Sequence, residues 1–129
     1  ITMIDHIELK VSNLDLAYNF YTYLLESIGY KCLKKRKDDN ENIIAYGFGM
    51  NNRVYFWIAS SSEDGIRSKV HLAFSAKSKD EVIAFHKMGL EIGAKDNGKP
   101  GYRLNYSTNY YASFLIDIDG NNIEAVLRE

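Results

Sequence analysis

The sequence predicts an α+β domain built from two βαβββ modules, the first at about residues 1–62 and the second at about residues 68–129. The first indication is an internal duplication: residues 5–29 and 70–93 each contain a short alternating strand with a histidine, a polar break and a helix that ends at glycine. The second indication is that strand-like runs follow each of these segments. The length of 129 residues suits a single domain with one core.

The first half opens with an alternating strand over residues 6–11, in which the odd positions are apolar. Ser12 or Asn13 caps the helix that follows, and Gly29 ends it. The apolar positions of this helix recur at helical spacing: Leu14, Ala17, Tyr18, Tyr21, Leu24, Leu25 and Ile28. Three strands are then expected, at residues 30–36, 43–48 and 53–59. A polar linker with a turn at Asp64-Gly65 leads to the second half.

The second half repeats this order. Its first strand begins at His71, which lies 65 positions after His6, and continues with apolar residues at every second position. Ser78-Lys79-Asp80-Glu81 has the spacing of a capping box, and the helix that it opens ends at Gly93. Gly89 lies inside this helix and weakens it by about 1 kcal/mol relative to alanine. The strands expected after the helix are at residues 101–106, 110–116 and 123–127.

The composition excludes several classes of function. With 16 basic and 17 acidic side chains the chain has no surplus of positive charge, and its basic cluster at residues 34–37 runs directly into two aspartates, so nucleic acid is not an expected partner. Cys32 is the single cysteine, which rules out an internal disulfide and fits a reducing compartment. The apolar stretches are too short to cross a bilayer and the first residues lack a secretory pattern, so we expect a cytoplasmic protein without a membrane partner.

Strand alternation places three potential metal ligands on equivalent faces. In the first strand the apolar positions would pack under the helix, which leaves His6 on the opposite face. The same argument puts His71 and Glu124 opposite the apolar positions of their own strands. Two histidines and one carboxylate from separate strands form a donor set for iron, manganese, nickel or zinc that leaves coordination positions open. A histidine on a strand is also commonly a hydrogen-bonded surface residue, so alternation alone does not establish a metal site.

Three segments carry a resemblance to a known superfamily: Ile4-Asp5-His6-Ile7, Val70-His71-Leu72-Ala73-Phe74 and Asp117-Ile118-Asp119-Gly120-Asn121-Asn122-Ile123-Glu124-Ala125. Together with the duplication, they resemble the vicinal-oxygen-chelate superfamily of glyoxalase I, extradiol dioxygenases, fosfomycin-resistance transferases and bleomycin-binding proteins. The resemblance implies that the halves form a curved mixed-sheet cup around a divalent metal held by His6, His71 and Glu124. It also implies a homodimer, with the cup closed either within one chain or across two.

One position departs from the glyoxalase-like members. Their fourth ligand, a glutamate, falls at residues 53–57 of this chain, where alternation directs Tyr55 and Trp57 into the cup. Neither residue is a usual metal ligand, and the remaining triad resembles that of the dioxygenase branch. We expect Tyr55 and Trp57 to contact the substrate instead.

The segment 96–106 and the tyrosine pair after it supply further candidate site residues, and they resemble a bacterial subgroup of the superfamily. Arg103 would bind a carboxylate or phosphate of the substrate and act with Tyr111 in catalysis, while Tyr106 would contact the substrate. In the alternative, Arg103 pins the loop through backbone carbonyls and the tyrosines fill the edge of the sheet. The third histidine, His86, is expected to be a packed or surface residue of the second helix.

Two classes of function follow from these residues. The first is a metal-dependent lyase or dioxygenase in which the ion binds neighbouring oxygens of a small substrate and acts as a Lewis acid. The second is a metal-free module, similar to the bleomycin-binding members, whose aromatic groove sequesters a drug or metabolite. A thiol transferase of the fosfomycin-resistance type would also need a thiol site, and the sequence shows no distinct one.

Overall fold

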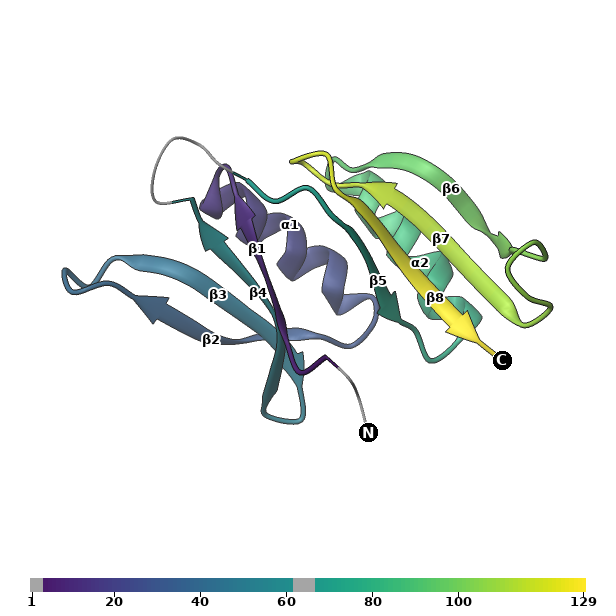
Figure 1. Ribbon diagram of the computed structural model, residues 1–129, viewed down its shortest axis with the longest axis horizontal. Helices are drawn as coiled ribbons and strands as arrows, with labels where there is room; N and C mark the ends of the chain where they lie inside the picture. Colours follow the sequence, from purple (N-terminus) through teal and green to yellow (C-terminus); the bar gives the residue numbers. More distant parts are fainter. Residues whose placement is uncertain (1–3, 62–66) are drawn as a thin grey trace.

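The computed structural model describes residues 4–61 and 67–129 (Figure 1). The predicted turn at Asp64-Gly65 lies outside the described residues. The order of elements is βαβββ twice, as the duplication predicted. The elements are β1 (Ile7–Val11), α1 (Leu14–Glu26), β2 (Lys31–Lys37), β3 (Ile43–Met50), β4 (Arg53–Ser60), β5 (His71–Ser75), α2 (Lys79–Glu91), β6 (Lys95–Tyr102), β7 (Tyr110–Ile116) and β8 (Asn122–Arg128).

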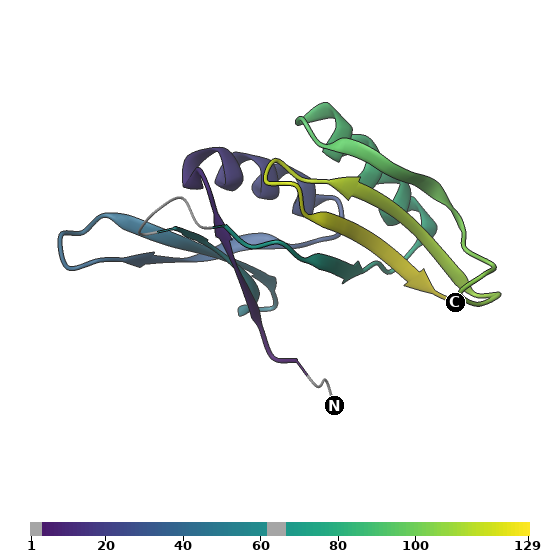
Figure 2. The same cartoon turned by 45° about the horizontal axis from the view of Figure 1, so that its top comes forward.

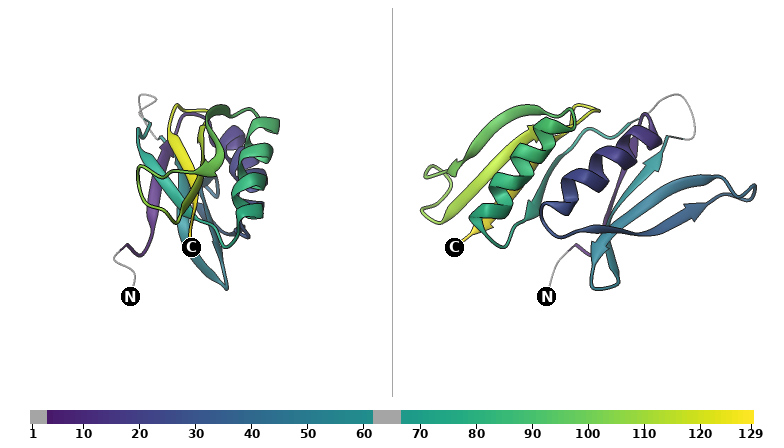
Figure 3. Two further views of the ribbon diagram at one scale, coloured as in Figure 1. Left: turned by 90° about the vertical axis from the view of Figure 1, so that its right-hand side faces the viewer. Right: turned by 180° about the vertical axis from the view of Figure 1, so that it is seen from behind.

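Each half forms its own four-stranded mixed sheet. The first sheet has the strand order β1-β4-β3-β2 and the second β5-β8-β7-β6. In each sheet the first strand pairs in parallel with the last, and the other pairs are antiparallel. Both helices lie on the same side of the two sheets, as the view from behind shows (Figure 3), so the other face of each sheet is not covered by a helix (Figures 1 and 2). Within the described residues no helix is long and apolar enough to span a membrane.

The predicted caps begin both helices. The Asn13 side chain accepts a hydrogen bond from the backbone of Leu16 at 3.0 Å. The Ser78 hydroxyl accepts one from the backbone of Glu81 at 3.1 Å, and the Glu81 carboxylate accepts one from the backbone of Lys77 at 2.7 Å. These bonds satisfy backbone donors that have no partner inside the helix.

One apolar core joins the two halves. The aromatic rings of Phe56 on β4 and Phe74 on β5 meet edge to face with 5.3 Å between centroids, and Phe74 also contacts Phe85 of α2. The buried side chains of this core come from both helices and both sheets: Leu9, Val11, Ala17, Phe20, Tyr21, Leu24, Leu25, Ile28, Tyr46, Phe48, Phe56, Ile58, Phe74, Ala76, Val82, Phe85, Ala94, Leu115, Ile123 and Ala125. Neither half therefore buries its apolar face alone.

The turn between β7 and β8, residues 117–121, ties the second half to the first. Asp117 accepts backbone hydrogen bonds from Asp119 and Asn121 through Oδ1, and its Oδ2 accepts a bond of 2.5 Å from the Tyr21 hydroxyl of α1. The Ser12 hydroxyl, at the end of β1, donates to Asp119 Oδ1 at 2.5 Å. Both carboxylates are buried in the chain, at 6% and 4% exposure, so these donors take the place of water.

The strand expected at residues 101–106 is displaced. The strand β6 covers Lys95–Tyr102, and residues 104–106 form a turn. Two register shifts, on either side of Gly98, let this irregular sequence continue as an edge strand, where a proline is tolerated. Beyond Tyr102 the Arg103 carbonyl accepts bonds from the backbone of Tyr106 and Ser107, so the chain turns back instead of extending.

Gly89 gives a test of how tightly α2 packs. A Cβ atom there would lie 2.2 Å from the Leu115 Cδ1 atom and 3.2 Å from the Leu24 Cδ1 atom, and both leucines are fully buried. We expect Gly89→Ala to lower the free energy of unfolding by about 1–3 kcal/mol in urea denaturation, because overpacking outweighs the better helix propensity. The exposed control Lys87→Ala should change it by less than about 0.5 kcal/mol. A more stable Gly89→Ala protein would contradict this packing.

Candidate metal and substrate site

His71 and Glu124, two of the three predicted metal ligands, meet on the uncovered face of the second sheet. They lie on the adjacent parallel strands β5 and β8, where His71 is opposite Asn122 and Ala73 is opposite Glu124. The His71 Nε2 atom is 3.0 Å from Glu124 Oε1, a contact that is an ion pair when the imidazole is protonated. The His71 side chain is half exposed and Glu124 is 1% exposed, so the carboxylate forms the floor of the site and the imidazole one wall.

Neighbouring groups fix the orientation of both side chains. The Nδ1 atom of His71 is 3.1 Å from the backbone carbonyl oxygen of Asn122, which can accept a hydrogen bond from Nδ1–H. The Phe114 ring stacks against the imidazole with 6.2 Å between centroids. The Tyr110 hydroxyl donates a hydrogen bond to Glu124 Oε2. The remaining lone pairs of the carboxylate therefore face His71.

Tyr110 is a hydrogen-bond donor over the whole neutral range. Desolvation by burial, followed by the hydrogen bond to Glu124 and the charge of that carboxylate, raises the pKa of Tyr110 to about 12. The phenol therefore stays protonated at neutral pH and stabilises the Glu124 carboxylate from the side opposite His71.

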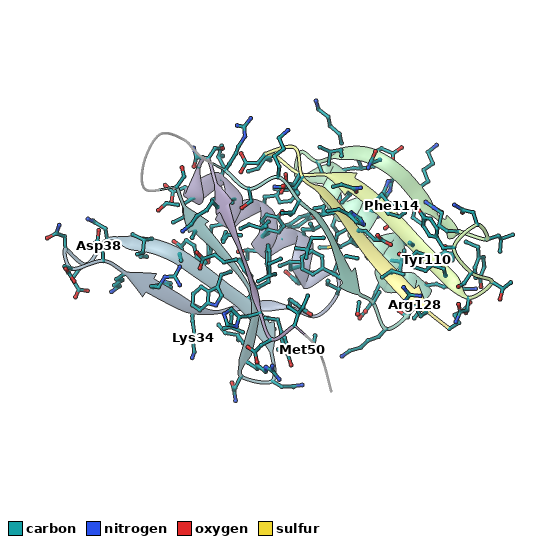
Figure 4. The ribbon with its side chains drawn as sticks, in the orientation of Figure 1. Lys34, Asp38, Met50, Tyr110, Phe114 and Arg128 are labelled. Atoms are coloured by element: carbon teal, nitrogen blue, oxygen red, sulfur yellow. The ribbon has the colours of Figure 1, made fainter. Side chains whose placement is uncertain are left out.

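These residues line an open pocket of about 310 Å³. Its walls are His71, Glu124, Tyr106, Tyr110 and Arg128. Figure 4 shows Tyr110 and Phe114 along β7 and Arg128 near the end of β8. The Arg128 guanidinium lies over the Tyr110 ring at 4.9 Å from its centroid. The pocket thus combines acceptor, donor and cationic groups within one sheet.

The third predicted ligand, His6, is not part of this pocket. It immediately precedes β1 of the first sheet, with its side chain 57% exposed and its Nδ1 atom 2.8 Å from Asp5 Oδ1. Asp5 also pairs with Arg53 at 2.6 Å, and the hydrogen bond from His6 followed by the charge of Arg53 lowers the pKa of the Asp5 carboxyl. Among residues 4–61 and 67–129, no three His, Cys, Asp or Glu side chains lie close enough together to hold a metal ion.

Arg103 is held by backbone carbonyls, as the alternative interpretation expected. Its guanidinium donates to the carbonyl oxygens of Lys99 at 2.6 Å and Gly101 at 3.0 Å, and it lies over the Phe114 ring. It lines a second pocket, of about 250 Å³, beside the first. Tyr106 lines both pockets and packs edge to face against Tyr110. Of these two predicted residues, Tyr106 is therefore the one at the His71 pocket.

Tyr111, predicted as a catalytic residue, lies on the other face of β7. Its ring packs against Tyr102 with 5.1 Å between centroids, beneath the Lys79 ammonium at the start of α2. The reason is strand alternation, which gives Tyr111 and Ser113 the helix side, while Tyr110 faces Glu124. Sequence analysis missed Tyr110 and Arg128. The sequence of β7 gives no clear signal of its faces, because residues on both sides of this strand are buried.

Tyr55 and Trp57 lie on the first sheet, apart from the His71 pocket. The Trp57 ring lies under the Arg36 guanidinium at 5.0 Å, and Arg36 donates to Glu8 at 2.7 Å. This hydrogen bond is the main reason that the pKa of Glu8 is lowered. Tyr55 contacts Arg53 and lines a cavity of about 160 Å³ to which strands β1, β4 and β5 contribute. The two aromatic residues thus belong to a separate surface with its own charges.

His86 and Cys32 have structural positions. His86 is 8% exposed, and its Nε2 atom is 2.8 Å from Asp96 Oδ1, which joins α2 to β6. This hydrogen bond is the main cause of the lowered pKa of the Asp96 carboxyl. Cys32 is a free cysteine whose thiol pKa is raised by burial, so it is a poor nucleophile at neutral pH.

Comparisons with solved structures identify proteins of the same fold. A glyoxalase/bleomycin resistance protein from Albidiferax ferrireducens has a TM-score of 0.79 and 26% identity, over 99% of this chain and 100% of that chain. A glyoxylase/bleomycin resistance protein/dioxygenase domain from a Frankia species has a TM-score of 0.72 and 17% identity, over 100% and 99%. A glyoxalase I variant from Zea mays has a TM-score of 0.71 and 20% identity, over 95% of this chain and 45% of that chain. No family model and no curated protein sequence matches the chain.

The two adjacent tyrosines of β7 allow a matched test of the site. We expect Tyr110→Phe to lower the free energy of unfolding by about 1–3 kcal/mol in urea denaturation, because the buried Glu124 carboxylate loses a donor. The control Tyr111→Phe removes a hydroxyl that has no hydrogen-bond partner among the described residues, and its effect should stay below about 0.5 kcal/mol. Equal effects of the two changes would refute the assignment of Tyr110 to Glu124.

Proposed function

Because this chain belongs to the vicinal-oxygen-chelate superfamily of glyoxalase, bleomycin-resistance and dioxygenase proteins, we propose that it is a divalent-metal-dependent enzyme. Its reaction would be that of a lyase or a dioxygenase, and its substrate a small oxygen-rich molecule. The reducing, cytoplasmic setting expected from the single cysteine is part of this proposal.

The observation that carries the proposal is the contact between His71 and Glu124. Two donor atoms that each lie about 2.1 Å from one ion, at right angles to each other, are about 3.0 Å apart. The Nε2 and Oε1 atoms have this spacing. A ligating histidine commonly donates its other ring N–H to a backbone carbonyl, as His71 is placed to do with Asn122. The donor pair therefore fits iron, manganese, nickel or zinc.

The bound ion would supply a Lewis acid that binds neighbouring oxygens of the substrate. The protein's own side chains would orient the ligands and contact the substrate. Glu124, held by the Tyr110 hydroxyl, would keep its carboxylate oriented while the substrate enters. Tyr106 would contact the substrate at the mouth of the pocket. The imidazole of His71 is restrained by Phe114 and by the Asn122 carbonyl, so little side-chain freedom would be lost on binding.

His6 would complete the ligand set from a second copy of the chain. The described residues of one chain bring only two of the three donors together, and the two sheets share no pair of hydrogen-bonded strands. In a symmetric dimer, the first half of one subunit would meet the second half of its partner twice, giving two equal sites. A homodimer is therefore part of the proposal, and its cup closes between subunits.

Metal content tests this proposal directly. We expect about one Fe, Mn, Ni or Zn ion per chain by elemental analysis of protein purified without added metal or chelator, and loss of that ion in His6→Ala and in His71→Ala. The control His86→Gln should retain it, because His86 binds Asp96 away from the pocket. If the wild-type protein takes up none of these ions on reconstitution, the proposed metal-dependent mechanism is wrong.

Mixing the two histidine variants, each of which is expected to bind no metal, tests whether the site is shared between subunits. In a dimer of one His6→Ala chain and one His71→Ala chain, one site has all its ligands and the other has lost both histidines. Random reassociation should restore metal to about one quarter of the sites, whereas either variant alone binds none. No recovery after confirmed exchange of subunits would show that the site is not shared.

A second function is favoured by the surface around Trp57. This half-buried indole on the uncovered face of the first sheet, with Arg36 above it, would suit a metal-free module that sequesters an aromatic drug. Since Trp57 is the single tryptophan, its fluorescence reports this surface alone. Under this reading, metal-free bleomycin should shift or quench the emission in a saturable way, and equally in His71→Ala. Unchanged emission would remove this function.

A further inference from the structure

Arg128 differs from the other arginines in having no carboxylate or carbonyl partner among the described residues. The chain has five arginines in the described residues. Four of them are bound to carboxylates or carbonyls: Arg36 to Glu8, Arg53 to Asp5, Arg67 to Asp119 and Arg103 to Lys99 and Gly101. Within residues 4–61 and 67–129, the Arg128 guanidinium makes no hydrogen bond and no ion pair with a carboxylate, and its contact is with the Tyr110 ring. Its hydrogen-bond donors are therefore available to a ligand.

The guanidinium is nevertheless held in place. It stacks over the Tyr110 ring at 4.9 Å from the centroid, and that ring is fixed by its own hydrogen bond to Glu124. Stacking occupies the flat face of a guanidinium and leaves its edge, which carries the N–H groups, free for a planar acceptor. Arg128 is the last residue of β8 and lines the same pocket as His71. It is thus a restrained cation at the edge of the site, whereas a free surface arginine would be mobile.

The negative and positive charges of the pocket differ in how many partners they have. The Glu124 carboxylate already has two partners, Tyr110 and His71. Among the described residues, the partner of the Arg128 charge is the Tyr110 ring. A group that entered beside Arg128 would therefore meet an unpaired cation and an exposed Tyr106 ring and hydroxyl.

We propose that Arg128 is the anchor for an oxyanion of the ligand, so that the pocket takes small molecules that carry a carboxylate or phosphate in addition to metal-binding oxygens. This deepens the proposed function and rests on the same pocket. The guanidinium binds the anion through paired N–H···O bonds, a geometry in which arginine exceeds lysine. The metal-binding oxygens of the ligand then face His71 and Glu124.

The test is a calorimetric titration of the protein, as purified, with benzoate and with inorganic phosphate. Arg128→Gln should weaken binding of the preferred anion about tenfold or more, and Arg128→Lys should lose part of that affinity. Lys95→Gln, an exposed cation on β6 of the same sheet, makes the same change in net charge and should bind like the wild type. Tighter binding of benzoate assigns the ligand to carboxylates, and tighter binding of phosphate assigns it to phosphates.

Three results would overturn the proposal. These are no binding of either anion by the wild type, unchanged affinity in Arg128→Gln, and an equal loss in Lys95→Gln, which would mean that net charge alone attracts the anion. Because Arg128 is exposed, its variants should have the same melting temperature as the wild type. Catechol, a neutral diol, separates this inference from the proposed function: its binding should depend on His71 and on bound metal, and be the same in Arg128→Gln.

Discussion

The buried turn between β7 and β8 is the constraint on which the site depends. Asp117 and Asp119 are carboxylates removed from water, and their oxygens are satisfied by the turn itself, by Tyr21 and by Ser12. A buried carboxylate that lost such donors would cost several kcal/mol, so the turn is restricted to one conformation. Gly120, at φ +87°, supplies the backbone geometry that other residues rarely adopt.

The same turn sets the register of the strands that carry His71 and Glu124. The Asn121 side chain accepts a hydrogen bond from the backbone of Val70, and the backbone of Asn122 donates to the Val70 carbonyl. These two bonds fix where β5 begins against β8. A shift of one residue would send His71 or Glu124 to the opposite face. The turn that joins the two halves therefore also brings the imidazole to the carboxylate.

The uncovered faces of the two sheets carry different kinds of side chain. The second sheet holds a buried carboxylate with a histidine, a tyrosine and an arginine around it. The first sheet holds an aromatic surface whose cations are neutralised locally, since Arg36 pairs with Glu8 and Arg53 with Asp5. Among the residues that line the His71 pocket, Arg128 is the cation that an anionic ligand would meet without a carboxylate partner. This asymmetry supports the proposal of a site centred on the second half.

The sequence by itself determined the elements and the faces of most strands. Alternation around Ile123 and Ala125 was sufficient to put Glu124 on the face of His71, because side-chain direction along a strand has a period of two. The same period would have separated Tyr110 from Tyr111, but the inward face of that strand was not assigned. The segment that became β6 was misjudged because its pairing depends on bulges at Gly98, which no local pattern shows. Only the tertiary structure decided which of the candidate ligands meet and which arginine of the described residues lacks a carboxylate partner. The distance from His6 to the other two residues depends on how two separate sheets pack against a shared core, and local propensities carry no information about that arrangement.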